Sequence, residues 1–248
     1  MDKAATVLGV SRPRAVVYIN DCLDVLSSVA ATHVVLPEAR AVDGTLIAIP
    51  HPHVFEGWYC RKGFPAVNVQ AVVDHRGAFR SISIRSGSNS DQSLWNGSGV
   101  RKRLSEFVPS GMHLLVDAGN KIWGHMLTPY PESEAVADRR KRVYNRLHSR
   151  TRIAVECAFG RLKNRFRILL GKFEQKTPER ICKLIYSCVV LHDMLFAVKD
   201  SYSVHGVDPL RATAHARDDD GWLAAAEQPF SHNVGVSKRD DLAVIFAA

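Results

Sequence analysis

Residues 139–172 form the most strongly basic stretch of the chain and read RRKRVYNRLHSRTRIAVECAFGRLKNRFRILLGK. It holds twelve Arg or Lys and a single acid, so its net charge is +11, against +8 for the whole chain of 248 residues. Apolar side chains recur at spacings of four and three, which predicts one buried stripe of an amphipathic helix. The stripe is Val155, Phe159, Leu162, Phe166 and Leu169. A basic helix of this kind favours a polyanionic partner.

The single acid of this stretch, Glu156, falls on a face next to the apolar stripe, together with Arg152, Gly160, Lys163 and Arg167. Two interpretations of Glu156 stay open from the residues alone. It is a ligand for a cation that acts on the bound polyanion, or it forms an ordinary charge pair with Arg152 one helical turn away.

Composition narrows the class of protein. Hydrophobic residues make up 46% and charged residues 23%, which is ordinary for a globular protein, and the pI near 9.4 favours nucleic acid as the partner. No apolar run of about 18 residues is present, so we expect no transmembrane helix. The cysteines are odd in number and form no CxxC pair, which indicates neither a disulfide framework nor a zinc site, and we expect a reducing compartment. They are Cys22, Cys60, Cys157, Cys182 and Cys188.

Three segments in the first half of the chain predict strands. Residues 40–50 enter as a strand, and residues 65–74 and 78–85 alternate around a turn at 75–77, which is typical of a hairpin. Together they predict a three-stranded antiparallel meander. Asp43 interrupts the first strand, either as an acid that binds a partner or as part of an Asp-Gly hairpin turn.

The middle of the chain predicts a helix from Asp91 towards Phe107 and then a short buried strand, MHLLVD, at 112–117. Asp117 ends this strand before Ala118-Gly119, so it either faces a site or caps a turn. Residues 122–130 fit a further strand or a loop.

The ends of the chain differ from its centre. The pattern LGVSRPRAVVYIN at 8–20 is similar to the turn and second helix of a helix-turn-helix, with a helix capping the main domain as the alternative. Residues 179–198 predict a long apolar helix in which His192 is a core residue. From 200 to 248 the composition holds eight acids and four Lys or Arg, which predicts an acidic, loosely ordered tail.

Asp43, Asp117 and Glu156 lie on two predicted strands and a helix. Acids that converge from separate elements are what a two-metal phosphoryl-transfer site requires, because hard oxygen ligands must hold both ions. Spacing alone is a weak signal for such a site.

Several motifs in this order resemble the DDE-superfamily endonucleases of PIF/Harbinger transposons and their domesticated nuclease relatives. The resemblance covers about residues 40 to 195. Its motifs are VDGT (42–45), YCRKGFPAVNVQAVVDHRG (59–77), GSNSDQSLW (87–95), LLVDAG (114–119), LTPY (127–130), NRLHSRTRIAVECAFGRLKNRFRIL (145–169) and CVVLHDM (188–194).

The resemblance implies an α/β, RNase H-like fold, a mixed sheet flanked by helices, and a metal-dependent DNA endonuclease or transposase. It assigns two divalent ions, Mg²⁺ or Mn²⁺, to Asp43, Asp117 and Glu156, and makes Asp91 an active-site neighbour. It places a set of basic residues near the DNA backbone: Arg61, Lys62, Arg150, Arg152, Arg161, Lys163, Arg165 and Arg167. The implied location is the nucleus, and the implied partners are DNA and a separate Myb-like DNA-binding protein, with a homo-oligomer left open.

The sequence departs from the usual family pattern at Leu46, Ala118, Asn120 and Asp193, none of which is a predicted metal ligand. Three parts are predicted: a helical segment at 1–35 resembling the end of a helix-turn-helix, the endonuclease domain at 36–199 and the tail at 200–248. Because full-length relatives carry a complete helix-turn-helix first, we expect a truncated copy. A retired transposase that binds DNA without cutting it is the alternative.

Overall fold

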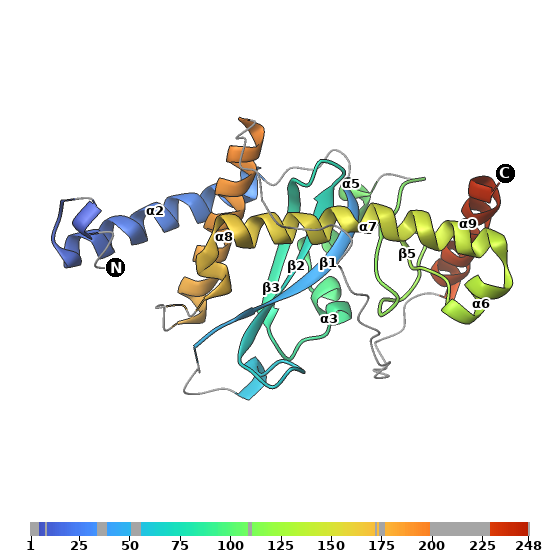
Figure 1. Cartoon of the computed structure of the whole chain (residues 1–248), viewed down its shortest axis with the longest axis horizontal. Coiled ribbons are helices and arrows are strands. Elements are labelled where there is room, and N and C mark those ends of the chain that lie inside the picture. The colour runs from blue at the N-terminus through green and yellow to red at the C-terminus, as the bar shows by residue number, and fades with distance from the viewer. Residues whose placement is uncertain are drawn as a thin grey trace.

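The computed structural model of the chain describes residues 5–7, 9–33, 39–50, 56–108, 111–171, 173, 177–198 and 229–247. A mixed five-stranded sheet has the order β3-β2-β1-β4-β5, and helices lie on both of its faces (Figure 1). The strands are β1 (Ala39–Ala48), β2 (Ala66–Asp74), β3 (Phe79–Ser86), β4 (Leu114–Leu115) and β5 (Met126–Leu127). The helices are α2 (Arg12–His33), η1 (Glu56–Trp58), α3 (Asp91–Asn96), α4 (Gly99–Lys102), α5 (Leu104–Phe107), α6 (Glu132–Ala137), α7 (Arg139–Arg165), η2 (Arg167–Leu170), α8 (Pro178–Ala197) and α9 (Pro229–Ala247).

The sheet confirms the predicted meander and the RNase H-like class. β1, β2 and β3 pair in antiparallel order, while β4 pairs with β1, and β5 with β4, in parallel. Asp43 lies in the middle of β1 opposite Ala71, so the alternative of an Asp-Gly hairpin turn at this position is wrong.

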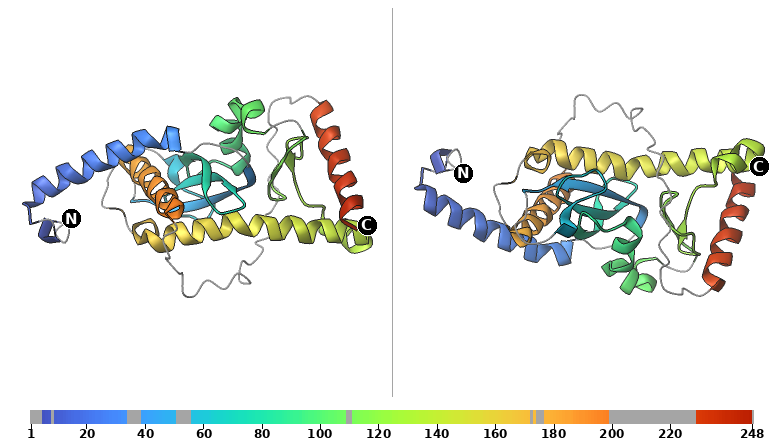
Figure 2. Two further views of the ribbon diagram at one scale, coloured as in Figure 1. Left: turned by 90° about the horizontal axis from the view of Figure 1, so that it is seen from above. Right: turned by 90° about the horizontal axis from the view of Figure 1, so that it is seen from below.

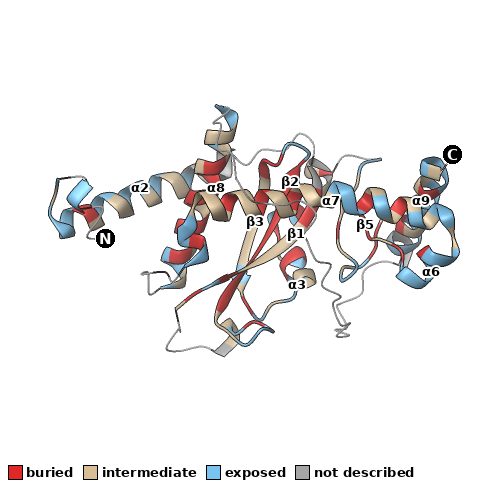
Figure 3. Cartoon of the chain, viewed as in Figure 1, coloured by how far each residue is buried: buried red, intermediate tan, exposed pale blue. Residues whose placement is uncertain are grey.

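Each face of the sheet has its own hydrophobic core. On one face, Val155, Phe159 and Leu162 of α7 pack with the apolar side of α8 against β1 and β2. On the other face, Trp95 and Val100 from the α3–α5 region pack against β1 and β4. Figure 2 shows the sheet between α7, in yellow, and the green α3–α5 segments, and Figure 3 shows the buried residues gathered along these two contacts.

The basic stretch forms a helix, as predicted, but α7 ends at Arg165. Phe166 leaves the helical conformation, with φ −108° and ψ 76°, and the chain continues as η2. Leu169 of the predicted stripe is buried from η2 rather than from α7. The predicted helix from Asp91 towards Phe107 is divided into α3, α4 and α5. Ser98 caps the start of α4 through its side chain, whereas α5 begins after Arg103, which has φ −122° and forms no side-chain cap.

The N-terminal segment forms a turn followed by a helix that packs on the main domain. Val10 N donates to Ala5 O (3.1 Å) across a turn in which Gly9 has φ +62°, so a turn precedes α2 as the pattern indicated. The later part of α2 packs on α8, where Lys183 Nζ lies 2.6 Å from Asp24 Oδ1.

The predicted loosely ordered tail is wrong for residues 229–247, which form α9, while residues 199–228 lie outside the described residues. α9 packs on α7 and β5, at the opposite end of the molecule from α2 (Figure 2). Tyr130 donates a hydrogen bond to Asp240 (2.6 Å), and Lys238 donates to the carbonyls of Gly111 and Met112 (2.8 and 2.9 Å). These contacts hold α9 in place despite the acidic composition that predicted a loosely ordered tail. No helix within the described ranges is long and apolar enough to span a membrane.

Candidate active site

The parallel pairing of β1 with β4 brings together the segments that carry two of the predicted metal ligands. Ala41 of β1 pairs with Leu115 of β4; Asp43 follows two residues later within β1, and Asp117 follows two residues later, past the end of β4. Because side chains alternate between the two faces of a sheet, residues two apart share a face. The register therefore directs the segment that carries Asp117 along β1 towards Asp43, beyond the last paired residue of β4.

Both acids lie on the face that α7 covers. Ala41 belongs to the core cluster that includes α7, which places Asp43 on that face. Leu114 and Val116 belong to the opposite cluster, so Asp117 also points towards α7.

Glu156 meets Asp43 from α7. Burial is the first cause that raises the pKa of the Glu156 carboxyl, and the negative charge of Asp43 is the second, while Arg152 acts in the opposite direction. An acid whose pKa is raised by another acid lies within its electrostatic reach. Strand β1 and helix α7 thus hold two carboxylates that repel each other, which is the arrangement that a cation between them would relieve.

Arg152 forms an ion pair with the carboxylate of Asp43. Its Nη2 lies 2.9 Å from Asp43 Oδ2, with only 15% of the Arg152 side chain and 14% of the Asp43 side chain exposed. The other oxygen, Oδ1, accepts the backbone N–H of Gly44 at 2.8 Å. The charge pair that the sequence suggested between Arg152 and Glu156 is thus directed to Asp43 instead, and Arg152 affects Glu156 less than Asp43 does.

Asp117 also caps a turn, which is the second role that its sequence position suggested. Asn120 donates from Nδ2 to Asp117 Oδ1 at 2.5 Å, and the backbone N–H of Asn120 donates to Asp117 O at 3.2 Å. Asp117 therefore closes the turn that follows β4.

The donor set fits a divalent ion in its chemistry, because three carboxylates supply hard oxygen ligands and Asp43 already holds a cationic group. The three are not gathered around one point. In the part of the chain that the structure describes, no three His, Cys, Asp or Glu side chains lie close enough to hold an ion as they stand.

A family model described as DDE superfamily endonuclease matches residues 42–193, the segment that holds all three acids. This chain belongs to the DDE superfamily endonucleases. It is 32% identical over 152 residues to the Mus musculus protein "Putative nuclease HARBI1", covering 60% of this chain and 43% of that protein. The Rattus norvegicus protein of the same name is 32% identical over 158 residues, covering 62% and 44%. "Protein ALP1-like" of Arabidopsis thaliana is 26% identical over 102 residues, covering 41% and 25%. The chain thus spans less than half the length of these relatives, and no solved structure matches it.

One residue predicted as a neighbour of the endonuclease site lies behind it. Asp91 sits at the start of α3, on the far face of the sheet, where its Oδ1 accepts from Asn68 Nδ2 at 3.1 Å. A Cβ atom on Gly44 would lie 2.8 Å from the same oxygen. Because Gly44 and Asp43 point to opposite faces of β1, Asp91 supports the strand from below and is not beside the Asp43 carboxylate.

The predicted DNA contacts on α7 divide between two faces of the helix. At 100° per residue, Arg152, Glu156 and Lys163 share one face, whereas Arg161 and Arg165 lie on the opposite side. Lys163 Nζ donates to Thr45 Oγ1 (2.6 Å) and to Leu46 O (3.3 Å), which places it on the β1 side near the acids.

Lys62 extends the positive charge on the β1 side. Burial is the main cause that lowers the pKa of Lys163, and the charge of Lys62 contributes, so the two ammonium groups are electrostatic neighbours. Lys62 is exposed, as are Arg61, Arg150 and Arg167, while the remaining predicted DNA contacts are partly buried. Spacing on the helix was enough to separate Lys163 from Arg161 and Arg165. Nothing in the sequence indicated that Thr45 is the hydrogen-bond partner of Lys163.

Arg161 and Arg165 pack against α8 instead. The Arg161 guanidinium lies 5.9 Å from the ring centre of Phe196, and a Cβ on Gly77 would meet its Nη2. Burial first, and then the charges of Arg165 and Arg161, lower the pKa of His192 to about 4. His192 is buried, as predicted for a core histidine, and these two arginines lie at the packed end of α8 rather than beside Asp43.

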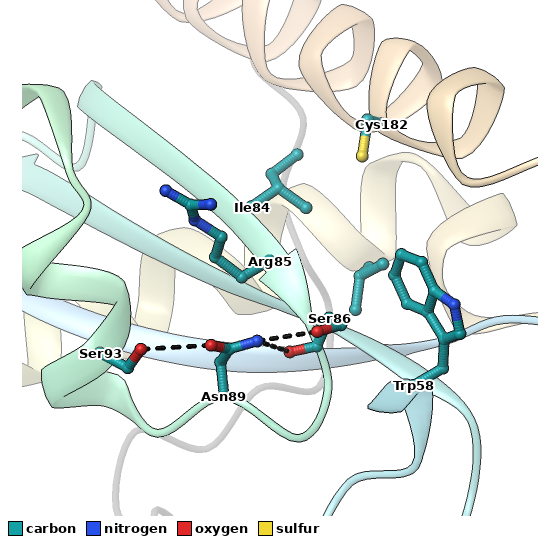
Figure 4. Close-up of a pocket in the computed structure, with 8 residues that line it drawn as sticks. Trp58, Ile84, Arg85, Ser86, Asn89, Ser93 and Cys182 are labelled. Atoms are coloured by element: carbon teal, nitrogen blue, oxygen red, sulfur yellow. Dashed lines mark hydrogen bonds between the residues drawn. The ribbon is translucent and has the colours of Figure 1, made fainter. Parts of the chain in front are cut away.

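A separate pocket of about 490 Å³ lies between η1, the end of β3 and α8 (Figure 4). Asn89 donates to Ser86 Oγ at 2.7 Å and accepts from Ser93 Oγ at 3.2 Å, so the polar groups on its wall bond to one another. None of the three predicted metal ligands lines it.

Proposed function

We propose that this chain is a divalent-metal-dependent endonuclease that hydrolyses DNA phosphodiesters, with Asp43, Asp117 and Glu156 as the metal ligands. The observation that carries the proposal is that Glu156 on α7 lies in electrostatic reach of Asp43 on β1, while the β1–β4 pairing brings the segment that carries Asp117 alongside β1. Family membership supports the nuclease class, and the metal, the DNA substrate and the residue roles are our proposal.

Two bound Mg²⁺ or Mn²⁺ ions would supply an activated water, or the freed 3′-hydroxyl of a cut strand, and would neutralise the leaving oxygen. The contribution of the chain is to orient that chemistry. Asp43 is held by strand pairing, Asp117 by the turn that follows β4, and Glu156 by a helix whose apolar face is packed. Lys163 and Lys62 add positive charge on the same side, where a phosphate backbone would lie.

The test is nicking of supercoiled plasmid in Mn²⁺ by the wild-type chain and by Glu156→Gln, which keeps the shape and removes the charge. Glu132→Gln, at an exposed position on α6, is the matched control. We expect nicking by the wild type and by the control, with a loss of at least about 100-fold in Glu156→Gln. Equal nicking by all three proteins would reject the assignment of Glu156.

A second function, DNA binding without cleavage, is favoured by one observation, the ion pair through which Arg152 occupies Asp43. It predicts DNA binding that persists in EDTA and weakens steeply with salt, with no nicking in any metal. Nicking lost in Glu156→Gln would exclude it.

We further propose a nuclear location and a separate Myb-like partner that selects the target sequence, on the basis of the family resemblance. A homo-oligomer is compatible with this proposal. Fluorescent tagging tests the location, and size-exclusion chromatography with light scattering tests self-association.

A further inference from the structure

Arg152 is an unusual neighbour for a metal ligand. Its guanidinium contacts Asp43 Oδ2 at 2.9 Å, in a pair that is mostly removed from solvent, and it lies one helical turn from Glu156. A guanidinium on this oxygen competes directly with a divalent ion for the same negative charge.

The guanidinium has a donor that the ion pair does not use. Its Nε is buried and has no hydrogen-bond partner, so it is left for a further acceptor. On α7 it lies on the same face as Lys163, whose ammonium group is beside β1. A small rotation of the side chain would keep it on this basic face and expose its donors to an approaching phosphate, which arginine binds well through paired N–H groups.

We propose that Arg152 is a positioning residue that forms an ion pair with Asp43 in the free protein and moves to a DNA phosphate when a divalent ion binds. The inference rests on the proposed function, because it takes Asp43 as a metal ligand. Ion binding releases the guanidinium, and DNA accepts it, so the ion and the DNA each strengthen the binding of the other. The Arg152–Asp43 ion pair keeps the affinity of the site for a divalent ion low until DNA is present.

The experiment is Mn²⁺ titration of the full chain by calorimetry without DNA. We expect Arg152→Gln to bind Mn²⁺ about tenfold more tightly than the wild type, because the competing cation is gone. Arg146→Gln removes the same charge from an exposed position elsewhere on α7 and should change the affinity by less than about twofold. Asp43→Asn should abolish the binding in either background.

A second measurement tests the coupling. The affinity for a short DNA duplex, followed by fluorescence anisotropy at fixed ionic strength, should rise when Mn²⁺ is added to the wild type and should rise less in Arg152→Gln. Circular dichroism checks that the variant folds. If it does not, Arg152→Lys keeps a buried charge with a weaker grip and should bind Mn²⁺ more tightly than the wild type by a smaller factor.

The outcomes separate the two proposals. If Mn²⁺ binds through Asp43 with the same affinity in the wild type, Arg152→Gln and Arg146→Gln, the inference about Arg152 is wrong while the proposed metal site stands. An equal rise in both arginine variants would show an effect of net charge and would also overturn it. Absence of Mn²⁺ binding in every variant would overturn both proposals.

Discussion

Gly44 of β1 and Asp91 of α3 are in close contact on the face of the sheet opposite α7: a Cβ atom on Gly44 would lie 2.8 Å from Asp91 Oδ1. That oxygen is fixed by the amide of Asn68 at 3.1 Å, so it cannot move away without losing a hydrogen bond. The glycine next to Asp43 is therefore required by packing on the far face. The Asp43-Gly44 pair belongs to a strand that packs closely against Asp91, not to a turn.

Gly44→Ala should destabilise the fold by roughly 1–3 kcal/mol, because the added methyl group overpacks this contact. Urea unfolding followed by circular dichroism measures the change. Combining it with Asp91→Ser should cost less than the sum of the two single changes, since the shorter side chain removes the clash. Additive effects would show that Gly44 is needed for another reason.

Asp193→Asn should remove a pH dependence of stability. Burial is the main cause that raises the pKa of Asp193 to about 7, although its Oδ1 accepts the N–H of Phe79 at 3.1 Å. A raised carboxyl pKa means that the folded state binds the proton more tightly, so stability falls as pH rises from about 4 to 7. Asparagine keeps the acceptor and carries no charge, so the variant should gain roughly 1–3 kcal/mol at pH 8 relative to the wild type and little at pH 4. Unfolding at the two pH values checks this, and a gain equal at both would contradict the assignment.

Lys62→Gln should weaken DNA binding several-fold and reduce the slope of log affinity against log salt by about 1, as expected for the loss of one phosphate contact. Lys102→Gln is the control, because Lys102 is equally exposed but lies on α4, on the other face of the sheet. Anisotropy titrations at several salt concentrations give both quantities. Equal losses in the two variants would place the DNA elsewhere.

Gly235→Ala should weaken the packing of α9 against the rest of the protein. A Cβ at this position would lie 2.5 Å from the backbone carbon of Trp123, and backbone cannot yield as a flexible side chain does. We expect faster proteolysis within the C-terminal segment and lower thermal stability. Gly160→Ala is the comparison, because nothing lies within 4 Å of a Cβ there, and replacing a mid-helix glycine should stabilise α7 by up to about 1 kcal/mol. Unchanged proteolysis in Gly235→Ala would mean that α9 tolerates the contact.

Periodicity predicted the parts of the fold whose burial is regular. The meander and the buried side of α7 follow from alternation and from the stripe that contains Val155 and Phe159, since each side chain there contacts one core. The end of α7 at Phe166 and the docking of α9 depend on contacts between distant segments, such as Tyr130 with Asp240, and leave no periodic signal.

The candidate site was predictable in its residue types but not in its pairing. Spacing on a helix sets Arg152 beside Glu156, yet the ion pair goes to Asp43 because the strand faces that side of α7. The face on which Asp91 lies follows from the register of β1 and β2, which a single sequence does not fix.

The most direct test of the central claim is a crystal structure of the wild-type chain with Mn²⁺ and a short DNA duplex, in which anomalous scattering locates the metal. We expect an anomalous peak within ligand distance, about 2.0–2.3 Å, of carboxylate oxygens of Asp43 and Asp117, with the Arg152 guanidinium moved from Asp43 to a phosphate. A peak away from these acids, or metal at Asp43 with the Arg152 ion pair intact, would contradict it.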